Sequence, residues 1–151
     1  MNTMRWRYGD TCPVMLPVDS DTVIEIGDLT YLDADDAKPA SLLAAEGDEQ
    51  AKQRLFHDNF AGVAMQASRR GNTQPIRVAT SGVFEFGCAS AALEVGDTVG
   101  PSINGEGVAL MNGTVKKVAG VHESIGRCAK RLNPPGALTL VDIVSQVLRC
   151  K

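Results

Sequence analysis

Two pairs of acidic residues recur in nearly the same local sequence and are the side chains best placed for chemistry. Glu25 and Asp28 lie in Val-Ile-Glu-Ile-Gly-Asp-Leu-Thr, and Glu94 and Asp97 lie in Ala-Leu-Glu-Val-Gly-Asp-Thr-Val. Two carboxylates can act together as a general acid and a general base. A Gly-Asp step also forms turns, because glycine adopts positive φ and aspartate caps local backbone amides. We expect matched turns, with a hydrolase as the alternative if all four carboxylates meet in one cleft.

Other reactive side chains are scattered along the chain. His57 and His122 stand alone, outside any His-x-x-x-His or His/Cys cluster, so the sequence supplies no zinc ligand set. The four cysteines show no Cys-x-x-Cys spacing, and we expect free thiols; they are Cys12, Cys88, Cys128 and Cys150. No Gly-x-Ser-x-Gly motif occurs, and the glycine-rich run 100–107 lacks the ending of a phosphate-binding loop. We therefore expect no catalytic residue, metal or cofactor.

The repeated acidic turns belong to a longer internal repeat, which must position them. Phe60-Ala61-Gly62-Val63-Ala64 is echoed by Ser124-Ile125-Gly126-Arg127-Cys128-Ala129, and each echo leads into a β-rich run, 75–80 and 138–144. The copies keep their order and nearly keep their spacing, which fixes the architecture before any other feature. We predict a mainly β chain that forms a small pseudo-duplicated β-barrel or β-sandwich-like domain, with half-repeats at about 22–86 and 92–148.

Three local patterns refine this prediction. A helical insertion at about 41–57 has Asp48 as its N-terminal cap and places Ala51, Leu55 and Phe56 on one face. Asn112-Gly113 is typical of a type I′ turn and predicts a hairpin between 108–110 and 115–118. The segment 138–148 suits either a strand or a helix, because its β-branched residues also lie at helical spacing.

Residues 1–20 show neither helical nor strand periodicity and contain prolines at 13 and 17. We expect an extended N-terminal arm in front of a single domain at 21–151. The arm carries Arg5, Trp6, Arg7 and Tyr8, and aromatic and arginine side chains are favoured anchors at interfaces. The alternative is a strand folded back on the core of the same domain.

Composition limits the partners. The 151 residues are 44% hydrophobic with a net charge of −3, which fits one globular domain without the basic face of a nucleic-acid-binding protein. No apolar run reaches the roughly 18 to 20 residues of a membrane span. The first ten residues lack the apolar core of a secretion signal, so we expect synthesis and folding in a cytoplasm.

Five segments in this order resemble the capsid cement (head decoration) proteins of tailed bacteriophages. They are Val23–Leu29, Phe60–Ala64, Pro75–Phe86, Leu93–Asp97 and Ile125–Arg127. The resemblance covers about residues 22 to 148 and implies a β-rich, non-enzymatic protein of the outer capsid surface of the virion, made in the host cytoplasm. It also implies homotrimers that clamp adjacent major capsid proteins near three-fold or quasi-three-fold positions.

The same resemblance makes Arg5, Trp6, Arg7 and Tyr8 candidate contacts with the capsid or with another protomer. The alternative is a cytosolic β-barrel module that binds a small ligand or another protein. Such a module predicts a deep pocket with converging polar groups.

Overall fold

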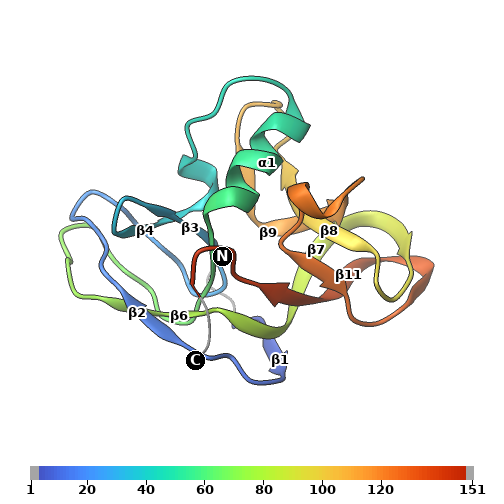
Figure 1. Cartoon of the computed structure of the whole chain (residues 1–151), viewed down its shortest axis with the longest axis horizontal. Helices are drawn as coiled ribbons and strands as arrows, with labels where there is room; N and C mark the ends of the chain where they lie inside the picture. Colours follow the sequence, from blue (N-terminus) through green and yellow to red (C-terminus); the bar gives the residue numbers. More distant parts are fainter. Residues whose placement is uncertain (1–3, 149–151) are drawn as a thin grey trace.

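The computed structural model describes residues 4–148, and this part of the chain is mainly β (Figure 1). The strands are β1 (Trp6–Tyr8), β2 (Val14–Leu16), β3 (Leu29–Asp33), β4 (Asp36–Pro39), β5 (Phe60–Ala64), β6 (Ile76–Ala79), β7 (Ser81–Leu93), β8 (Thr98–Ile103), β9 (Leu110–Lys117), β10 (Gly126–Cys128) and β11 (Leu132–Val144). The helical segments are η1 (Ala40–Leu42), α1 (Glu49–Asn59) and η2 (Val121–Glu123).

The two halves of the chain fold with the same strand order. One sheet runs β2-β6-β5-β3-β4, and the other runs β7-β11-β10-β8-β9, with β1 added beside β7. Counted from its own first strand, each unit therefore has the order first, fifth, fourth, second, third. This identity confirms the predicted pseudo-duplicated, mainly β fold. The duplicated units begin at β2 and at β7, so residues 81–86 belong to the second unit by topology.

The two units close to different extents. In the second unit β7 also pairs in parallel with β9, which completes a five-stranded barrel. In the first unit β2 and β4 are the edge strands, and the Ala37 amide donates to the Pro17 carbonyl oxygen across the gap at 2.9 Å. Figure 1 shows the first unit on the left and the second on the right, with α1 above and between them.

Matched glycines allow two strands to pass closely in each unit. A Cβ atom at Gly62 would collide with the Ala79 carbonyl oxygen, and a Cβ atom at Gly126 would collide with the Asp142 carbonyl oxygen. These contacts join β5 to β6 and β10 to β11, which are equivalent pairs in the strand order. The glycine recurs in the sequence repeat because, in both units, the neighbouring strand leaves no space for a side chain at this position.

Helix α1 begins with the predicted cap, since the Asp48 carboxylate accepts a hydrogen bond from the Ala51 amide at 2.9 Å. The predicted apolar face is wrong in part, because Ala51 and Leu55 are exposed. The residues of the helix that are buried are Lys52, Gln53, Phe56 and His57. This face is largely polar because Gln53 and His57 contact backbone oxygens of the second unit and Lys52 donates to the Ala45 carbonyl oxygen before the helix.

Three hydrogen-bonding contacts show how α1 joins the units. Gln53 Nε2 donates to the Pro101 carbonyl oxygen at 2.8 Å, and His57 Nδ1 lies 2.7 Å from the Ser124 carbonyl oxygen. Gln50 Nε2 also donates to the buried Glu123 carboxylate at 2.7 Å. The insertion of the first unit is thus an internal clamp on the second.

The first two strands and the last strand of residues 4–148 all pair with strands of the two units. β1 pairs with β7 and therefore extends the sheet of the second unit. β2 pairs with β6 and therefore belongs to the sheet of the first unit. Of the two interpretations left open for residues 1–20, the folded-back strand therefore holds at 6–8 and 14–16. The segment 138–148, open between strand and helix, continues β11 as far as Val144.

The predicted hairpin turn at Asn112-Gly113 is wrong, because both residues lie inside β9. Asn112 Oδ1 accepts a hydrogen bond from the Ser41 amide at 2.8 Å, and Gly113 leaves space that the Arg5 guanidinium fills. The asparagine and the glycine are thus used for contacts between distant segments. The turn between β8 and β9 lies earlier, in residues 104–109.

The expectation of free thiols is wrong at Cys12, which is disulfide-bonded. Spacing could not show this, because disulfides join cysteines that are distant in sequence. Cys88 and Cys128 are buried free thiols, as expected. Cys150 lies outside the described residues.

Candidate functional site

The two acidic turns have the same geometry. Asp28 Oδ2 accepts a hydrogen bond from the Glu25 amide at 2.9 Å, and Asp97 Oδ2 accepts one from the Glu94 amide at 2.9 Å. The intervening glycines have φ values of 93° at Gly27 and 92° at Gly96. The expectation of matched structural turns is confirmed, with glycine supplying positive φ and aspartate supplying the acceptor.

The four carboxylates have different surroundings. Glu25 forms an ion pair with Arg69 at 2.6 Å, and Glu94 forms one with Arg131 at 3.2 Å. Asp97 Oδ2 lies 3.5 Å from Lys117 Nζ. Only the first acidic pair lines the hollow described next, so the geometry gives no basis for a hydrolase that uses all four.

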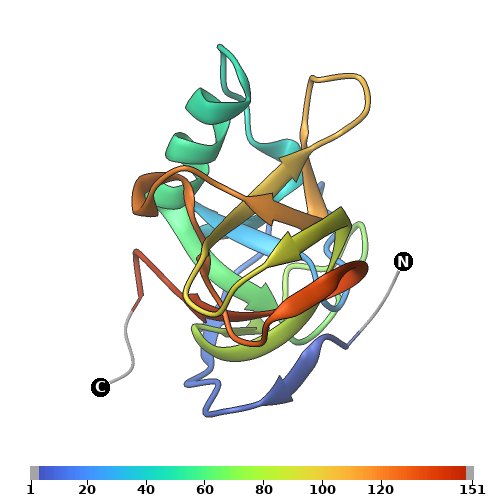
Figure 2. The same ribbon diagram turned by 90° about the vertical axis from the view of Figure 1, so that its right-hand side faces the viewer.

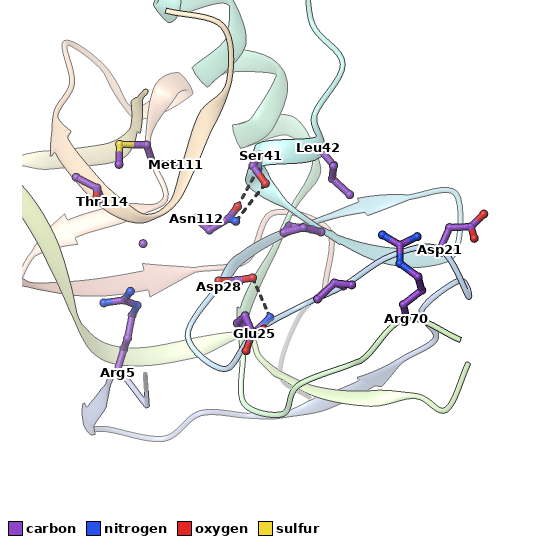
Figure 3. Close-up of a pocket in the computed structure, with 13 residues that line it drawn as sticks. Arg5, Asp21, Glu25, Asp28, Ser41, Leu42, Arg70, Met111, Asn112 and Thr114 are labelled. Carbon is purple, nitrogen blue, oxygen red and sulfur yellow. Dashed lines mark hydrogen bonds between the residues drawn. The ribbon is translucent and has the colours of Figure 1, made fainter. Parts of the chain in front are cut away.

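A hollow of about 490 Å³ lies between the first unit and β9 (Figure 3). Its polar and charged lining residues are Arg5, Asp21, Glu25, Asp28, Ser41, Arg70, Asn112 and Thr114. Val23, Leu42 and Met111 add partly exposed apolar side chains. Sequence reasoning singled out Glu25, Asp28 and Arg5 but missed Asp21, Ser41 and Thr114 and assigned Asn112 to a turn, because only the fold brings these distant segments together.

Asp28 is the most buried carboxylate of the hollow, with 8% of its surface exposed. Burial raises the pKa of the Asp28 carboxyl above its ordinary value, because the charged form loses hydration. Arg5, just before β1, also lines the hollow, and its charge favours the ionised form of Asp28, but its hydrogen bonds go to other groups. Its Nε donates to the Gly27 carbonyl oxygen at 3.0 Å, and the group lies 5.6 Å from the centre of the Phe86 ring.

A second candidate surface, called here the apolar row on β1, is formed by Trp6 and Tyr8 of β1 and by Met4 just before the strand. These alternate residues are all exposed, Trp6 by 41% and Tyr8 by 51%. Arg7 forms an ion pair with Glu85 at 2.9 Å. Of the four predicted contact residues, Trp6 and Tyr8 are therefore the most available to a partner, whereas Arg5 is held inside the hollow.

The two histidines are brought together by the packing of α1 on η2. The rings of His57 and His122 are 6.0 Å apart and nearly perpendicular. Beside them, the hydrogen bond from Gln50 lowers the pKa of Glu123 below its ordinary value. Within residues 4–148, no group of three or more histidine, cysteine, aspartate or glutamate side chains is arranged to hold a metal ion.

Comparisons with known proteins gave no match to any family model, curated protein or solved structure. Within the part of the chain that the structure describes, no helix has the length and hydropathy to span a membrane.

Proposed function

We propose that the protein is a non-enzymatic structural component of a tailed-phage virion. In this proposal it decorates the outer capsid surface as homotrimers at three-fold or quasi-three-fold positions and clamps adjacent major capsid proteins. Four of the five sequence segments that suggest this role occupy equivalent turns and strand crossings in the two units, and the fifth, Pro75–Phe86, spans β6 and the start of β7. The resemblance therefore lies in features that determine the fold.

The observation that carries the proposal is the apolar row on β1. Large exposed apolar side chains gathered on one strand are typical of a surface that a partner covers. β1 lies at the outer margin of the molecule, below the barrel in Figure 2, where a large lattice can reach it. Trp6 and Tyr8 are residue types that often provide much of the binding energy of an interface.

The partner is expected to contact the side chains of β1 rather than its backbone edge. The pairing of β1 with β7 shifts register between Trp6 and Tyr8, which indicates a bulge at the edge of the sheet. Bulges and charged residues such as Arg7 discourage the addition of another strand. Because strand addition is discouraged, we expect the capsid to bind β1 by burying its aromatic side chains.

A decoration protein of this kind acts by mass action. A protein that binds only the expanded lattice stabilises that lattice by its binding free energy. Symmetry multiplies a modest contact, because a trimer engages several neighbouring capsid subunits at once.

Co-sedimentation with expanded capsids tests this role. We expect saturable binding by the natural protein and about a tenfold or greater loss of affinity in the double variant Trp6→Ser, Tyr8→Ser. Met15→Ser is the matched control, because Met15 is an exposed apolar side chain on β2, with 56% of its surface exposed. Deletion of residues 1–20 is unsuitable, since it removes β2 and the buried Leu16 and Val18.

Two results would contradict the proposal. Failure of the natural protein to bind expanded capsids would remove the capsid role. Equal occupancy by the double variant and the control would leave the capsid role but remove β1 from it.

The alternative, a module that binds a protein or a small ligand, is favoured by one observation. The hollow falls within the range of about 300–1,000 Å³ that is common for ligand pockets. A soluble ligand that binds there and no affinity for capsids would favour this function.

A further inference from the structure

The two duplicated turns differ in one respect that bears on the hollow. In the second unit the carboxylate of Asp97 has a cation beside it, Lys117, at 3.5 Å. In the first unit the equivalent carboxylate of Asp28 forms no ion pair with any residue in 4–148. Asp28 is nevertheless the more buried of the two, and a buried carboxylate without an ion-paired cation is costly.

The strand register shows which residue replaces the lysine. Lys117 is paired with Val99, which lies three residues after Gly96. The equivalent residue in the first unit is Thr30, three residues after Gly27, and it is paired with Pro39. Pro39 therefore occupies the position in the first unit that Lys117 occupies in the second. Pro39 also lines the hollow.

No cation of residues 4–148 forms an ion pair with Asp28, although the charge of Arg5 acts on its carboxylate from a longer distance. Arg5 donates to the Gly27 carbonyl oxygen at 3.0 Å and lies against Phe86. Arg69 is paired with Glu25 at 2.6 Å. Figure 3 places Arg70 with Asp21 at the far end of the hollow, away from Asp28.

We propose that the hollow binds a lysine side chain presented by an extended segment of a partner protein, with Asp28 as the acceptor of its ammonium group. The bound lysine takes the place that Lys117 has beside Asp97. The residues that flank the lysine in the partner contact the apolar side chains of Val23, Leu42 and Met111. This surface is separate from the apolar row on β1, and the inference does not depend on the capsid role.

The chemistry favours lysine over a free metal cation. The second unit neutralises the same turn with an ammonium group, which is a compact charge that can donate to a single carboxylate oxygen. Asp28 Oδ2 already accepts the Glu25 amide, and Glu25 is held by Arg69. A metal ion that requires several free oxygen ligands is less well served here.

The test uses two peptides with blocked ends, acetyl-Val-Lys-Val-amide and the same peptide with norleucine in place of lysine. Binding to the full chain is measured by calorimetry and by NMR shifts of the residues that line the hollow. We expect the lysine peptide to bind about tenfold or more tightly than the norleucine peptide, as for loss of a charged hydrogen bond.

Three variants of the protein locate the binding. Asp28→Asn retains an acceptor for the Glu25 amide and is expected to reduce affinity for the lysine peptide about tenfold. Asp97→Asn is the matched control, because its turn is the same but its cation is internal, and it should leave affinity unchanged. Pro39→Lys supplies the missing internal cation and should abolish binding.

Several outcomes would overturn the inference. These are no binding of the lysine peptide to the natural protein, equal binding of the two peptides, or equal binding by Asp28→Asn. A chain that starts at Met4 provides a further check. Binding to that shorter chain alone would mean that residues 1–3 compete for the hollow, and the partner would then be unnecessary.

Discussion

At the scale of single residues, Asp28 combines two roles that conflict. Its Oδ2 caps the turn that begins at Glu25, and its burial in the hollow opposes the charge that makes it a strong acceptor. The turn was predictable from the sequence, because a Gly-Asp step favours a turn through the positive φ of glycine and the capping carboxylate of aspartate. The burial was not, since Ser41 and Asn112 reach the same hollow from distant segments.

The raised pKa of Asp28 predicts how stability depends on pH. At pH values between the unfolded and the folded pKa, the folded protein holds a proton that the unfolded chain has released. The contribution of Asp28 to stability is therefore complete below the unfolded pKa and is lost as pH rises through the folded pKa. Asp28→Asn removes this dependence while it retains an acceptor for the turn.

Urea denaturation across a pH series measures this effect. The free energy of unfolding of Asp28→Asn, relative to that of the natural protein, should increase as pH rises from acid through that window. Two curves that stay parallel would show that burial does not destabilise the carboxylate.

At the scale of elements, the glycines of β5 and β10 show why the repeat is visible in the sequence at all. Gly62 and Gly126 are kept because the neighbouring strand passes too closely for a side chain. Helix α1 shows the opposite case. Its cap follows from Asp48, but its buried face could not be read from apolar spacing, because Gln53 and His57 bind carbonyl oxygens of the second unit.

Alanine at these two glycines should destabilise the protein by similar amounts. Gly62→Ala and Gly126→Ala each place a Cβ atom against a carbonyl oxygen, and we expect each to lower the free energy of unfolding by about 3 kcal/mol. Gly105→Ala is the control, because its added Cβ has no neighbour within 4 Å. It should change stability by less than about 0.5 kcal/mol.

Thermal and chemical unfolding of the three variants provides the measurement. A tolerated alanine at either crossing would mean that the strands can separate without cost. Equal loss in all three variants would point to backbone freedom rather than to the crossing.

At the scale of the whole molecule, the chain is two copies of one strand order joined by an insertion that only the first copy carries. The sequence predicted the duplication and the β class, because turns and crossings repeat. It did not predict that α1 would clamp the units, or that Asn112 and Gly113 would lie inside β9. Those outcomes depend on contacts between segments that are far apart in the chain.

The whole molecule also leaves two surfaces available, and they suit different partners. The apolar row on β1 suits a broad protein surface, and the hollow suits one lysine and its neighbours. The duplicated fold supplies the rigid body that holds them apart.

The binding stoichiometry on capsids tests the central claim most directly. The proposed role assigns the chain to a tailed phage, so expanded and unexpanded capsids, built from the major capsid protein that this role predicts as its partner, are titrated with the natural protein and sedimented. The proposed decoration role predicts saturation on expanded capsids alone, at three copies for each three-fold or quasi-three-fold position. Equal binding to both capsid forms, or no binding to either, would contradict it.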